Sequence, residues 1–362
     1  MIDWIPITYY TTLYYQILLA LVLLTVLHSQ LLGIDEQKNK IFTAFSGSFL
    51  LFFVLFYMGL RPINGVFVDM VTYAQLFERI SNGYEITLNE DVGFDFFIRL
   101  STKIMTVQMF FFACAVIYVL PLWYLSKKWF SQYWFYAFLM LVGSFSFWAY
   151  GTNGIRNGLA TSLFLLALAF NKRKVLMVLF FLLSCSMHKS MLLPVLAYGV
   201  TLINNNPKKY ILVWLAAIPL SLVLGSFWES LFGGLGFDDR MSYLTAGNVN
   251  DDDFTSTGFR WDFVVYSATG VFAGYYFVIK KEFNDMMYNH LLNIYLIVNA
   301  FWILIIRANF SNRFAYLSWF LLAMVIIYPF LKQKKIQNKK MSIVIVIYFL
   351  FTYLMNVILV KE

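Results

Sequence analysis

The sequence predicts an all-α, polytopic integral membrane protein, and three observations support that prediction. Of the 362 residues, 61% are hydrophobic, 20% are aromatic and only 13% are charged, which is far from the balance of a soluble domain. Apolar runs of membrane-crossing length recur along the chain. Lysines and arginines gather in short clusters between these runs, as expected when basic residues set membrane topology. The formal net charge of +8 therefore does not indicate nucleic-acid binding, and we expect no nucleic-acid partner.

We expect a single transmembrane domain over residues 1–362 with about twelve transmembrane helices, because roughly 20 apolar residues cross the hydrocarbon core as a helix. The first run follows a leader without Lys or Arg, which favours a retained helix over a cleaved signal. The sixth and seventh runs are short and nearly fused around His188, so a kinked pair is expected there. The expected segments are residues 12–32, 41–60, 106–126, 132–151, 155–171, 174–188, 190–203, 210–228, 261–279, 287–306, 313–331 and 341–360.

The basic clusters predict the orientation of these helices. They fall in alternate loops, so all of them can be cytoplasmic at once. Both termini then lie outside the cytoplasm, and the two longest outer loops are residues 61–105 and 229–260. The clusters are Lys38 with Lys40, Lys127 with Lys128, residues 172–174, Lys208 with Lys209, Lys280 with Lys281, and residues 332–340.

The first long outer loop is expected to contain two amphipathic helices. Apolar side chains recur at helical spacing from Phe67 to Phe77, which predicts a helix lying on the membrane surface. A second amphipathic stretch follows Asp91. In it, Asp95 and Arg99 are four residues apart, and we expect this pair to be structural.

The second long outer loop contains the acidic run Asp251 to Asp253. Several oxygen ligands together suit hard cations such as Ca²⁺, but the alternating spacing of a calcium-binding loop is missing. We therefore expect a solvated loop and no metal site. No cofactor is expected.

Arginines occupy the predicted outer side, although positive charge there opposes the topological bias. A guanidinium recognises phosphate in a planar, bidentate way, so this choice predicts an anion site. The alternative is that each arginine reaches lipid headgroups or pairs with an aspartate, which explains Arg61 and Arg260 equally well. Arg156 differs because Gly154 and Gly158 flank it at a close-packing spacing. The outer arginines are Arg61, Arg156, Arg240, Arg260, Arg307 and Arg313.

His188 is the one histidine of three on the predicted outer face, because His28 and His290 lie near cytoplasmic helix ends. Imidazole titrates near neutrality, which suits a general base. The alternative is a buried histidine whose hydrogen bonds are satisfied. The two cysteines, Cys114 and Cys185, lie inside apolar runs, which indicates packing rather than a disulfide or redox site.

Several polar motifs, taken in order along the chain, match those of one family. The sequence resembles the EpsG-like branch of the Wzy-type polysaccharide polymerases, bacterial membrane proteins that polymerise repeat units of O-antigen, capsule or exopolysaccharide. Asn157 stands where family members often have glutamine, which retains the amide. The matching pieces are Arg61 with Asp69, Tyr73 and Phe77; Asp91 with Gly93; Arg156 to Ala160; His188 with Ser190; Asp239 and Arg240 with Tyr243; and Arg313 with Tyr316.

The resemblance implies a metal-independent, multi-pass glycosyltransferase in the bacterial cytoplasmic (inner) membrane, with its active site facing the periplasm or cell exterior. Its substrates would be undecaprenyl-pyrophosphate-linked oligosaccharides, and membrane lipids and a chain-length regulator protein would be further partners. Arginines would stabilise the charge that grows on the leaving pyrophosphate. The pyrophosphate ligands would be Arg156, Arg240, Arg313 and Arg61. The catalytic residues would be His188 as the base, Asp69 as an alternative base, and Arg156. The sugar-binding residues would be Tyr73, Asp91, Asn157, Asp239 and Tyr243.

Three other classes of membrane protein share parts of this pattern. A secondary transporter or lipid-linked oligosaccharide flippase also has many helices. However, the two halves of this sequence show no internal repeat, and its polar residues gather on the predicted outer side rather than at the middle of the membrane. A membrane O-acyltransferase would use His188 as its base, but a second polar cluster near that residue is not evident. An O-antigen ligase performs nearly the same chemistry, and the sequence does not separate it from a polymerase.

Overall fold

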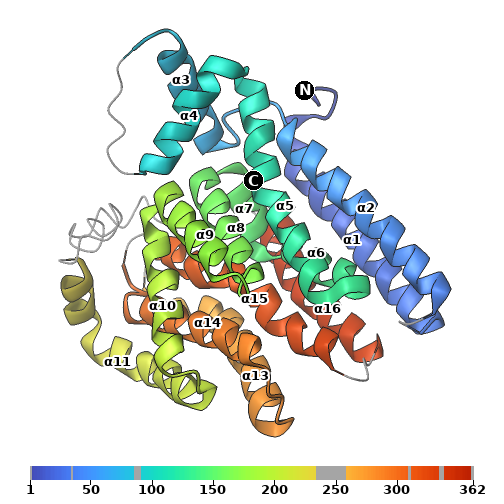
Figure 1. Cartoon of the computed structure of the whole chain (residues 1–362), viewed down its shortest axis with the longest axis vertical. Coiled ribbons are helices and arrows are strands. Elements are labelled where there is room, and N and C mark those ends of the chain that lie inside the picture. Colours follow the sequence, from blue (N-terminus) through green and yellow to red (C-terminus); the bar gives the residue numbers. More distant parts are fainter. Residues whose placement is uncertain are drawn as a thin grey trace. The chain divides into compact units, whose positions relative to one another are not determined.

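All regular secondary structure in the described part of the chain is helical (Figure 1), as the composition predicts. The structure is a computed structural model. It describes residues 2–33, 36–84, 91–233, 258–308, 311–333 and 338–359. The chain divides into two compact units: Met1–His188 with Phe330–Glu362, and Lys189–Pro329.

The first unit is built around α8, which contacts both α5 and α9, while α2 packs on α5 and α1 packs on α16. Small side chains allow this close approach. The Ser184 hydroxyl of α9, for example, donates to the carbonyl oxygen of Ala160 on α8 at 2.6 Å. The helices are α1 (Ile7–Leu31), α2 (Gln37–Gly59), α3 (Val68–Ser81), α4 (Val92–Ile104), α5 (Val107–Phe130), α6 (Trp134–Val142), α7 (Phe145–Thr152), α8 (Ile155–Ala169), α9 (Lys174–Met187) and α16 (Asn338–Tyr353).

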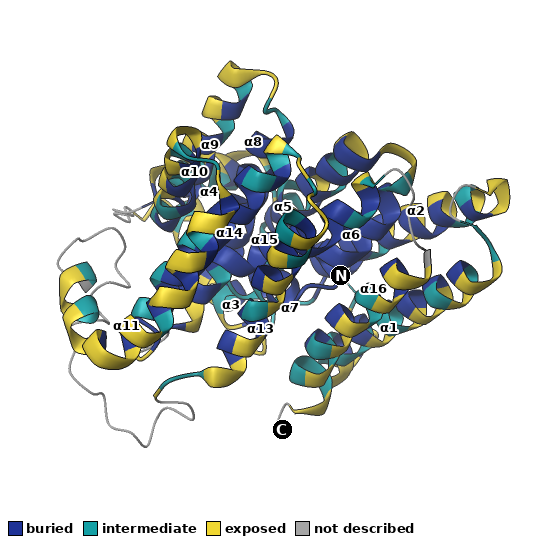
Figure 2. Cartoon of the chain, turned by 90° about the horizontal axis from the view of Figure 1, so that it is seen from below, coloured by how far each residue is buried: buried dark blue, intermediate teal, exposed yellow. Residues whose placement is uncertain are grey.

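The fourth expected segment, residues 132–151, is a broken helix. α6 ends at Val142, where Gly143 donates its N–H to the carbonyl of Leu139 at 2.9 Å. Ser144 is extended, and α7 starts at Phe145. Every side chain of α6 is buried (Figure 2). A broken helix of this kind is tolerated at membrane depth because neighbouring protein surrounds it.

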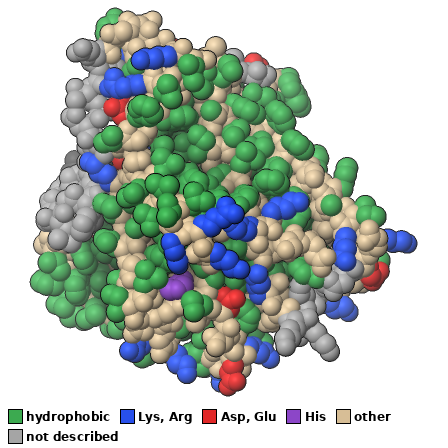
Figure 3. Space-filling model, viewed as in Figure 1, with side chains coloured by type: hydrophobic (Ala, Val, Ile, Leu, Met, Phe, Trp, Pro, Cys, Tyr) green, Lys and Arg blue, Asp and Glu red, His purple; other side chains and the backbone are tan. Residues whose placement is uncertain are grey.

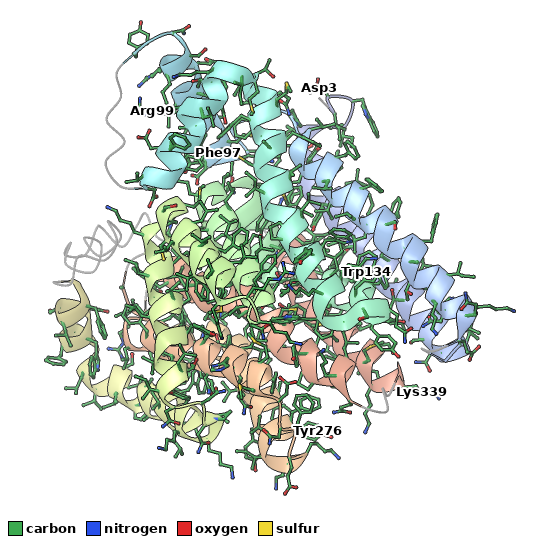
Figure 4. All side chains as sticks on the ribbon, in the orientation of Figure 1. Asp3, Phe97, Arg99, Trp134, Tyr276 and Lys339 are labelled. Carbon is green, nitrogen blue, oxygen red and sulfur yellow. The ribbon has the colours of Figure 1, made fainter. Side chains whose placement is uncertain are left out.

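α3 and α4 form the two amphipathic helices expected in the first long loop, and they contact each other. Met70, Ala74 and Phe77 of α3 are buried, in agreement with the apolar spacing. On α4, Arg99 pairs with Asp95 at 2.6 Å, as predicted. Figure 4 labels Arg99 on this helix. α4 also packs against α9, so the hairpin rests on the body of the first unit.

The second unit is held together by a polar network that is buried among apolar helices. Asn299 of α14 accepts a hydrogen bond from Trp214 of α11 at 2.7 Å. Its amide nitrogen donates to Ser267 of α13 and to Ser318 of α15, at 3.1 and 2.9 Å. The helices of this unit are α10 (Leu192–Ile203), α11 (Pro207–Gly233), α13 (Trp261–Gly274), α14 (Met286–Leu304) and α15 (Asn312–Lys332, which runs into the first unit).

The helices agree with a polytopic membrane protein. Eight of the described helices are long and apolar enough to cross a membrane. Three shorter apolar helices, Ile155–Ala169, Lys174–Met187 and Lys189–Ile203, occupy the fifth to seventh expected segments. Each expected segment thus contains helix in the described residues, while the number of crossings and their orientation remain predictions.

The surface of the chain also suits a membrane. Apolar side chains cover much of the face seen in Figure 3, and Lys and Arg lie among them in separate groups. Large side chains such as Phe45, Leu182 and Val223 are exposed. A soluble protein rarely exposes so much contiguous apolar surface, so these side chains are suited to contact lipid.

Candidate active site

Arg156 stands at the second position of α8, directly after the turn at Gly154. A cation is unfavourable there, because the amino end of a helix carries partial positive charge. The structure compensates with a buried carboxylate: Arg156 Nη1 donates to Asp91 Oδ2 at 2.7 Å, and the Asp91 side chain is only 6% exposed. Asp91 immediately precedes α4, so this ion pair joins the α3–α4 hairpin to the start of α8.

Tyr73 of α3 holds the same guanidinium from a second direction. Its hydroxyl oxygen accepts a hydrogen bond from Arg156 Nε at 2.8 Å, and its ring packs against Phe94 of α4 with centroids 5.2 Å apart. Burial raises the pKa of Tyr73 to about 12, although the charge of Arg156 opposes this shift. The phenol is therefore neutral at physiological pH.

Asp69 lies one turn before Tyr73 on α3 and is partly exposed. Its negative charge acts on both Tyr73 and Arg156, and it contributes to the raised pKa of Tyr73. α3 therefore brings a second carboxylate close to the guanidinium. We call Arg156, Asp91, Tyr73 and Asp69 the Arg156 cluster.

The Arg156 cluster is open on one side. The Arg156 side chain is 36% exposed. Asp91 and Tyr73 use Nη1 and Nε, whereas Nη2 has no hydrogen-bond partner within the described part of the chain. A guanidinium held in plane by two neighbours can offer its remaining N–H groups to an anion with defined geometry.

Two glycines let the helices approach closely enough to build this cluster. A Cβ on Gly93, two residues after Asp91, would collide with Ser186 of α9. A Cβ on Gly158 would lie 2.6 Å from the carbonyl oxygen of Tyr150 on α7. The close packing expected from the spacing around Arg156 is thus present at Gly158.

Arg61 lies at the carboxyl ends of two helices. It is 1% exposed. Its Nη1 donates to the carbonyl of Met58 in the last turn of α2 at 2.5 Å, and its Nη2 to the carbonyl of Thr152 at the end of α7 at 3.4 Å. Phe67 and Phe111 stack beside it, with centroids 5.5 and 5.7 Å from Cζ. Burial lowers the pKa of Arg61 to about 10, so the side chain remains charged at neutral pH.

These contacts give Arg61 a structural part in the site. A cation at a helix carboxyl end is stabilised by the carbonyl oxygens there, and Thr152 precedes the turn that leads to Arg156. Arg61 therefore contacts the end of the helix that precedes that turn. Contact between Arg61 and pyrophosphate remains a prediction.

Three other expected site residues also lie in the described part of the chain. His188 follows the end of α9 and is 4% exposed. Asn157 is 6% exposed within α8. Arg313 belongs to the second unit, where it is exposed in the first turn of α15. Their expected roles remain predictions.

Three expected site residues, Asp239, Arg240 and Tyr243, lie outside the described residues. The acidic run Asp251 to Asp253 lies there too. In the part of the chain that is described, no group of three or more His, Cys, Asp or Glu side chains could hold a metal ion.

The pairing of Asp91 with Arg156 is not predicted by the sequence. Asp91 is expected there as a sugar-binding residue, in a motif with Gly93. The available signal was the lone acid at the start of an amphipathic helix in the same outer loop as Tyr73. Helical periodicity is local, so it does not pair two residues that are 65 positions apart.

Comparison with known protein families gave a match. A model described as the EpsG family matches residues 45–362, which includes every residue of the Arg156 cluster. Neither the curated proteins nor the solved structures gave a match.

Proposed function

Since this chain belongs to the EpsG family, we propose that it polymerises undecaprenyl-pyrophosphate-linked oligosaccharide repeat units into a surface polysaccharide. Family membership and the apolar helices make it a polysaccharide polymerase-like, multi-pass membrane protein. The proposal adds the donor, the acceptor and the extracytoplasmic position of the site. The observation that supports it best is the partly open guanidinium of Arg156, held in plane by Asp91 and Tyr73.

The proposed reaction forms one bond and breaks one. The oxygen of an acceptor hydroxyl attacks the anomeric carbon of the donor glycan. The bond from that carbon to the pyrophosphate oxygen breaks, and its electron pair leaves with undecaprenyl pyrophosphate. The proton of the acceptor passes to a base. Negative charge grows on the pyrophosphate, and a guanidinium fixed beforehand stabilises that charge more in the transition state than in the ground state.

Asp69 and His188 are the two candidate bases, and the geometry favours Asp69. Asp69 is partly exposed and acts electrostatically on Arg156, so a base and an anion ligand stand close together. His188 is buried, with 4% of its surface exposed. The variants Asp69→Asn and His188→Gln distinguish the two candidates. Substitution of the true base should lower kcat steeply, and substitution of the other residue should not.

The remaining expected residues complete the proposal. Arg240 and Arg313 are proposed as further pyrophosphate ligands, and Asn157, Asp239 and Tyr243 as sugar ligands. Arg61 is proposed to act through the turn before Arg156. Undecaprenyl-pyrophosphate glycans, membrane lipids and a chain-length regulator are the proposed partners.

The experiment that tests this function follows lipid-linked repeat units in cells that depend on this protein. Arg156→Ala should abolish long glycan chains and leave single repeats on the outer leaflet of the membrane. Arg99→Ala is the matched control, because Arg99 is an arginine of the same hairpin that pairs with Asp95 on α4 and is not part of the Arg156 cluster. Single repeats that accumulate on the cytoplasmic leaflet would identify a flippase instead. Normal long chains that stay on undecaprenyl pyrophosphate would identify a ligase.

A further inference from the structure

A patch of five exposed cations lies at the end of α8 that is opposite Arg156. Two of them stand in the last turn of α5. The other three follow Phe170 at the turn from α8 to α9, where the N–H of Arg173 donates to the carbonyl of Phe170 at 2.7 Å. Lys128 joins the two groups, because its Nζ lies 4.0 Å from the ring centre of Phe170. We call these residues the basic patch: Lys127, Lys128, Lys172, Arg173 and Lys174.

No acidic side chain neutralises the basic patch. The sequence contains no Asp or Glu between Asp95 and Glu229, and none of the five cations forms an ion pair within the described residues. Aromatic rings contact both lysines of α5 instead. The Nζ of Lys127, for example, lies 4.5 Å from the ring centre of Trp134. A ring holds an ammonium group in place without cancelling its charge.

The start of α9 gives a second reason to expect an anion at the basic patch. Arg173 precedes α9, Lys174 is its first residue, and the side chain of Arg173 does not cap the helix. The amino end of a helix carries partial positive charge, so cations there are unfavourable unless an anion lies close by. Asp91 supplies that anion to Arg156 at the start of α8, whereas no described carboxylate pairs with Arg173 or Lys174.

An apolar stripe on α9 begins directly beside the basic patch. Its members recur at helical spacing, which puts them on one face of the helix, and 49–74% of each residue is exposed. Phe180 of α9 stacks on Phe170, the ring beneath Lys128, with centroids 5.4 Å apart. The cations and the stripe therefore adjoin. The stripe consists of Val175, Val178, Leu179 and Leu182.

We propose that the basic patch and this stripe bind an anionic phospholipid. The phosphate of its headgroup lies at the cations, and its acyl chains lie along α9. Basic clusters beside transmembrane helices bind anionic headgroups, and the adjoining stripe favours a lipid over an acidic protein segment, which would leave these apolar side chains uncovered. This binding does not depend on the proposed function, because it involves neither the donor nor the Arg156 cluster.

Native mass spectrometry of the purified full chain in detergent tests this binding. The original protein should bind phosphatidylglycerol about tenfold more tightly than phosphatidylcholine, whose headgroup has no net charge. Lys172→Gln combined with Lys174→Gln should weaken the binding of phosphatidylglycerol about 25-fold, since each cation near an anionic headgroup contributes roughly fivefold. The same double variant should leave the binding of phosphatidylcholine unchanged.

Lys208→Gln combined with Lys209→Gln is the matched control. It removes the same charge from an exposed pair of lysines at the start of α11, and it should leave the affinity for phosphatidylglycerol unchanged. Equal affinity of the original protein for the two lipids would overturn the inference. An equal loss in the two double variants would also overturn it, because binding would then follow the net charge of the protein.

A second measurement uses the unmodified protein. A phosphatidylglycerol with a diazirine in one acyl chain should label peptides from residues 174–187. Excess unlabelled phosphatidylglycerol should remove this label, whereas excess phosphatidylcholine should not. Label confined to other helices would contradict the proposed site. Removal of the label by undecaprenyl phosphate at lower concentrations than phosphatidylglycerol would assign the surface to the carrier lipid and would likewise contradict it.

Discussion

At the scale of single residues, Arg156 combines two properties that seldom occur together. Its Nε and Nη1 atoms are fixed by Tyr73 and Asp91 at 2.8 and 2.7 Å, while 36% of the side chain is exposed. A freely moving surface arginine would lose conformational entropy on binding an anion. Arg156 is already ordered, so less of its interaction free energy with a developing charge is spent on ordering the side chain, and more of it lowers the reaction barrier.

Arg156→Lys should therefore fail although it retains the positive charge. An ammonium is a compact point charge, and it does not reproduce a planar fork that contacts Tyr73 and Asp91 at once. Chain extension by the purified variant should fall about 100-fold, as for the loss of a transition-state hydrogen-bond donor. Arg99→Lys should stay near the original rate. Full activity of Arg156→Lys would mean that charge alone is sufficient at this position.

Tyr73 provides a prediction about pH. Because burial raises the pKa of Tyr73 to about 12, the phenol is neutral in the folded protein well beyond the pH at which a free tyrosine ionises. The stability that its neutral form contributes is complete below about pH 10, and it is lost as the pH rises toward 12.

The pH–rate profile should accordingly show no ionisation of Tyr73 below pH 10. Tyr73→Phe should lower the rate by loosening Arg156, and it should leave the shape of the profile unchanged between pH 6 and 9. An alkaline limb that is present in the original protein and disappears in Tyr73→Phe would assign an ionising role to Tyr73, contrary to this account.

At the scale of elements, the α3–α4 hairpin supplies three of the four residues of the Arg156 cluster. Its position depends on the contact between α4 and α9, where Gly93 lies directly against Ser186. Exposed apolar side chains of α4, such as Phe96 and Leu100, suit the membrane interface.

Gly93→Ala should displace α4 from α9 and carry Asp91 with it. We expect about a tenfold loss of chain extension, because shifts near 1 Å in a positioned group have effects of this order or larger. Gly65→Ala is the control, since no atom lies within 4 Å of a Cβ built there. Equal activity of the two variants would show that the α4–α9 contact does not position the site.

The elements also show how far sequence reasoning extends. The spacing from Phe67 to Phe77 predicted a surface helix, and α3 is present with the expected residues buried. The break between α6 and α7 was not predicted, because the segment from 132 to 151 is mostly apolar and reads as one helix, whereas in the structure it is interrupted at Gly143 and Ser144. Local patterns identified the helices, whereas tertiary contacts decided where one of them ends.

The same limit applies to the candidate site. Arg156 and Tyr73 were both proposed as site residues, but their mutual hydrogen bond and the buried partner Asp91 depend on how α3, α4 and α8 meet. Arg61 was expected at a pyrophosphate, and its nearest groups are two backbone carbonyls and two rings. A motif gives the residue type, and the fold determines what that residue contacts.

At the scale of the whole molecule, a buried polar network has to be weighed against the transporter alternative. It lies deep in the second unit, where Asn299 has a partner for its amide oxygen and for its nitrogen. Such satisfied networks join helices in membranes. The network is therefore accounted for by packing and does not by itself indicate a transport site.

Chelation of divalent cations tests how the leaving group is neutralised. If guanidinium groups provide the compensating charge, EDTA should leave the rate of chain extension unchanged. Loss of activity with EDTA, followed by recovery with Mg²⁺, would show that a metal ion neutralises the charge on the leaving pyrophosphate.

The most direct measurement uses the purified protein in proteoliposomes that contain a lipid-linked repeat unit. We predict that each joined repeat releases one molecule of undecaprenyl pyrophosphate, and that Arg156→Ala abolishes both products together while the protein remains folded. Movement of lipid-linked repeats across the bilayer without release of pyrophosphate, or unchanged release by Arg156→Ala, would contradict the account.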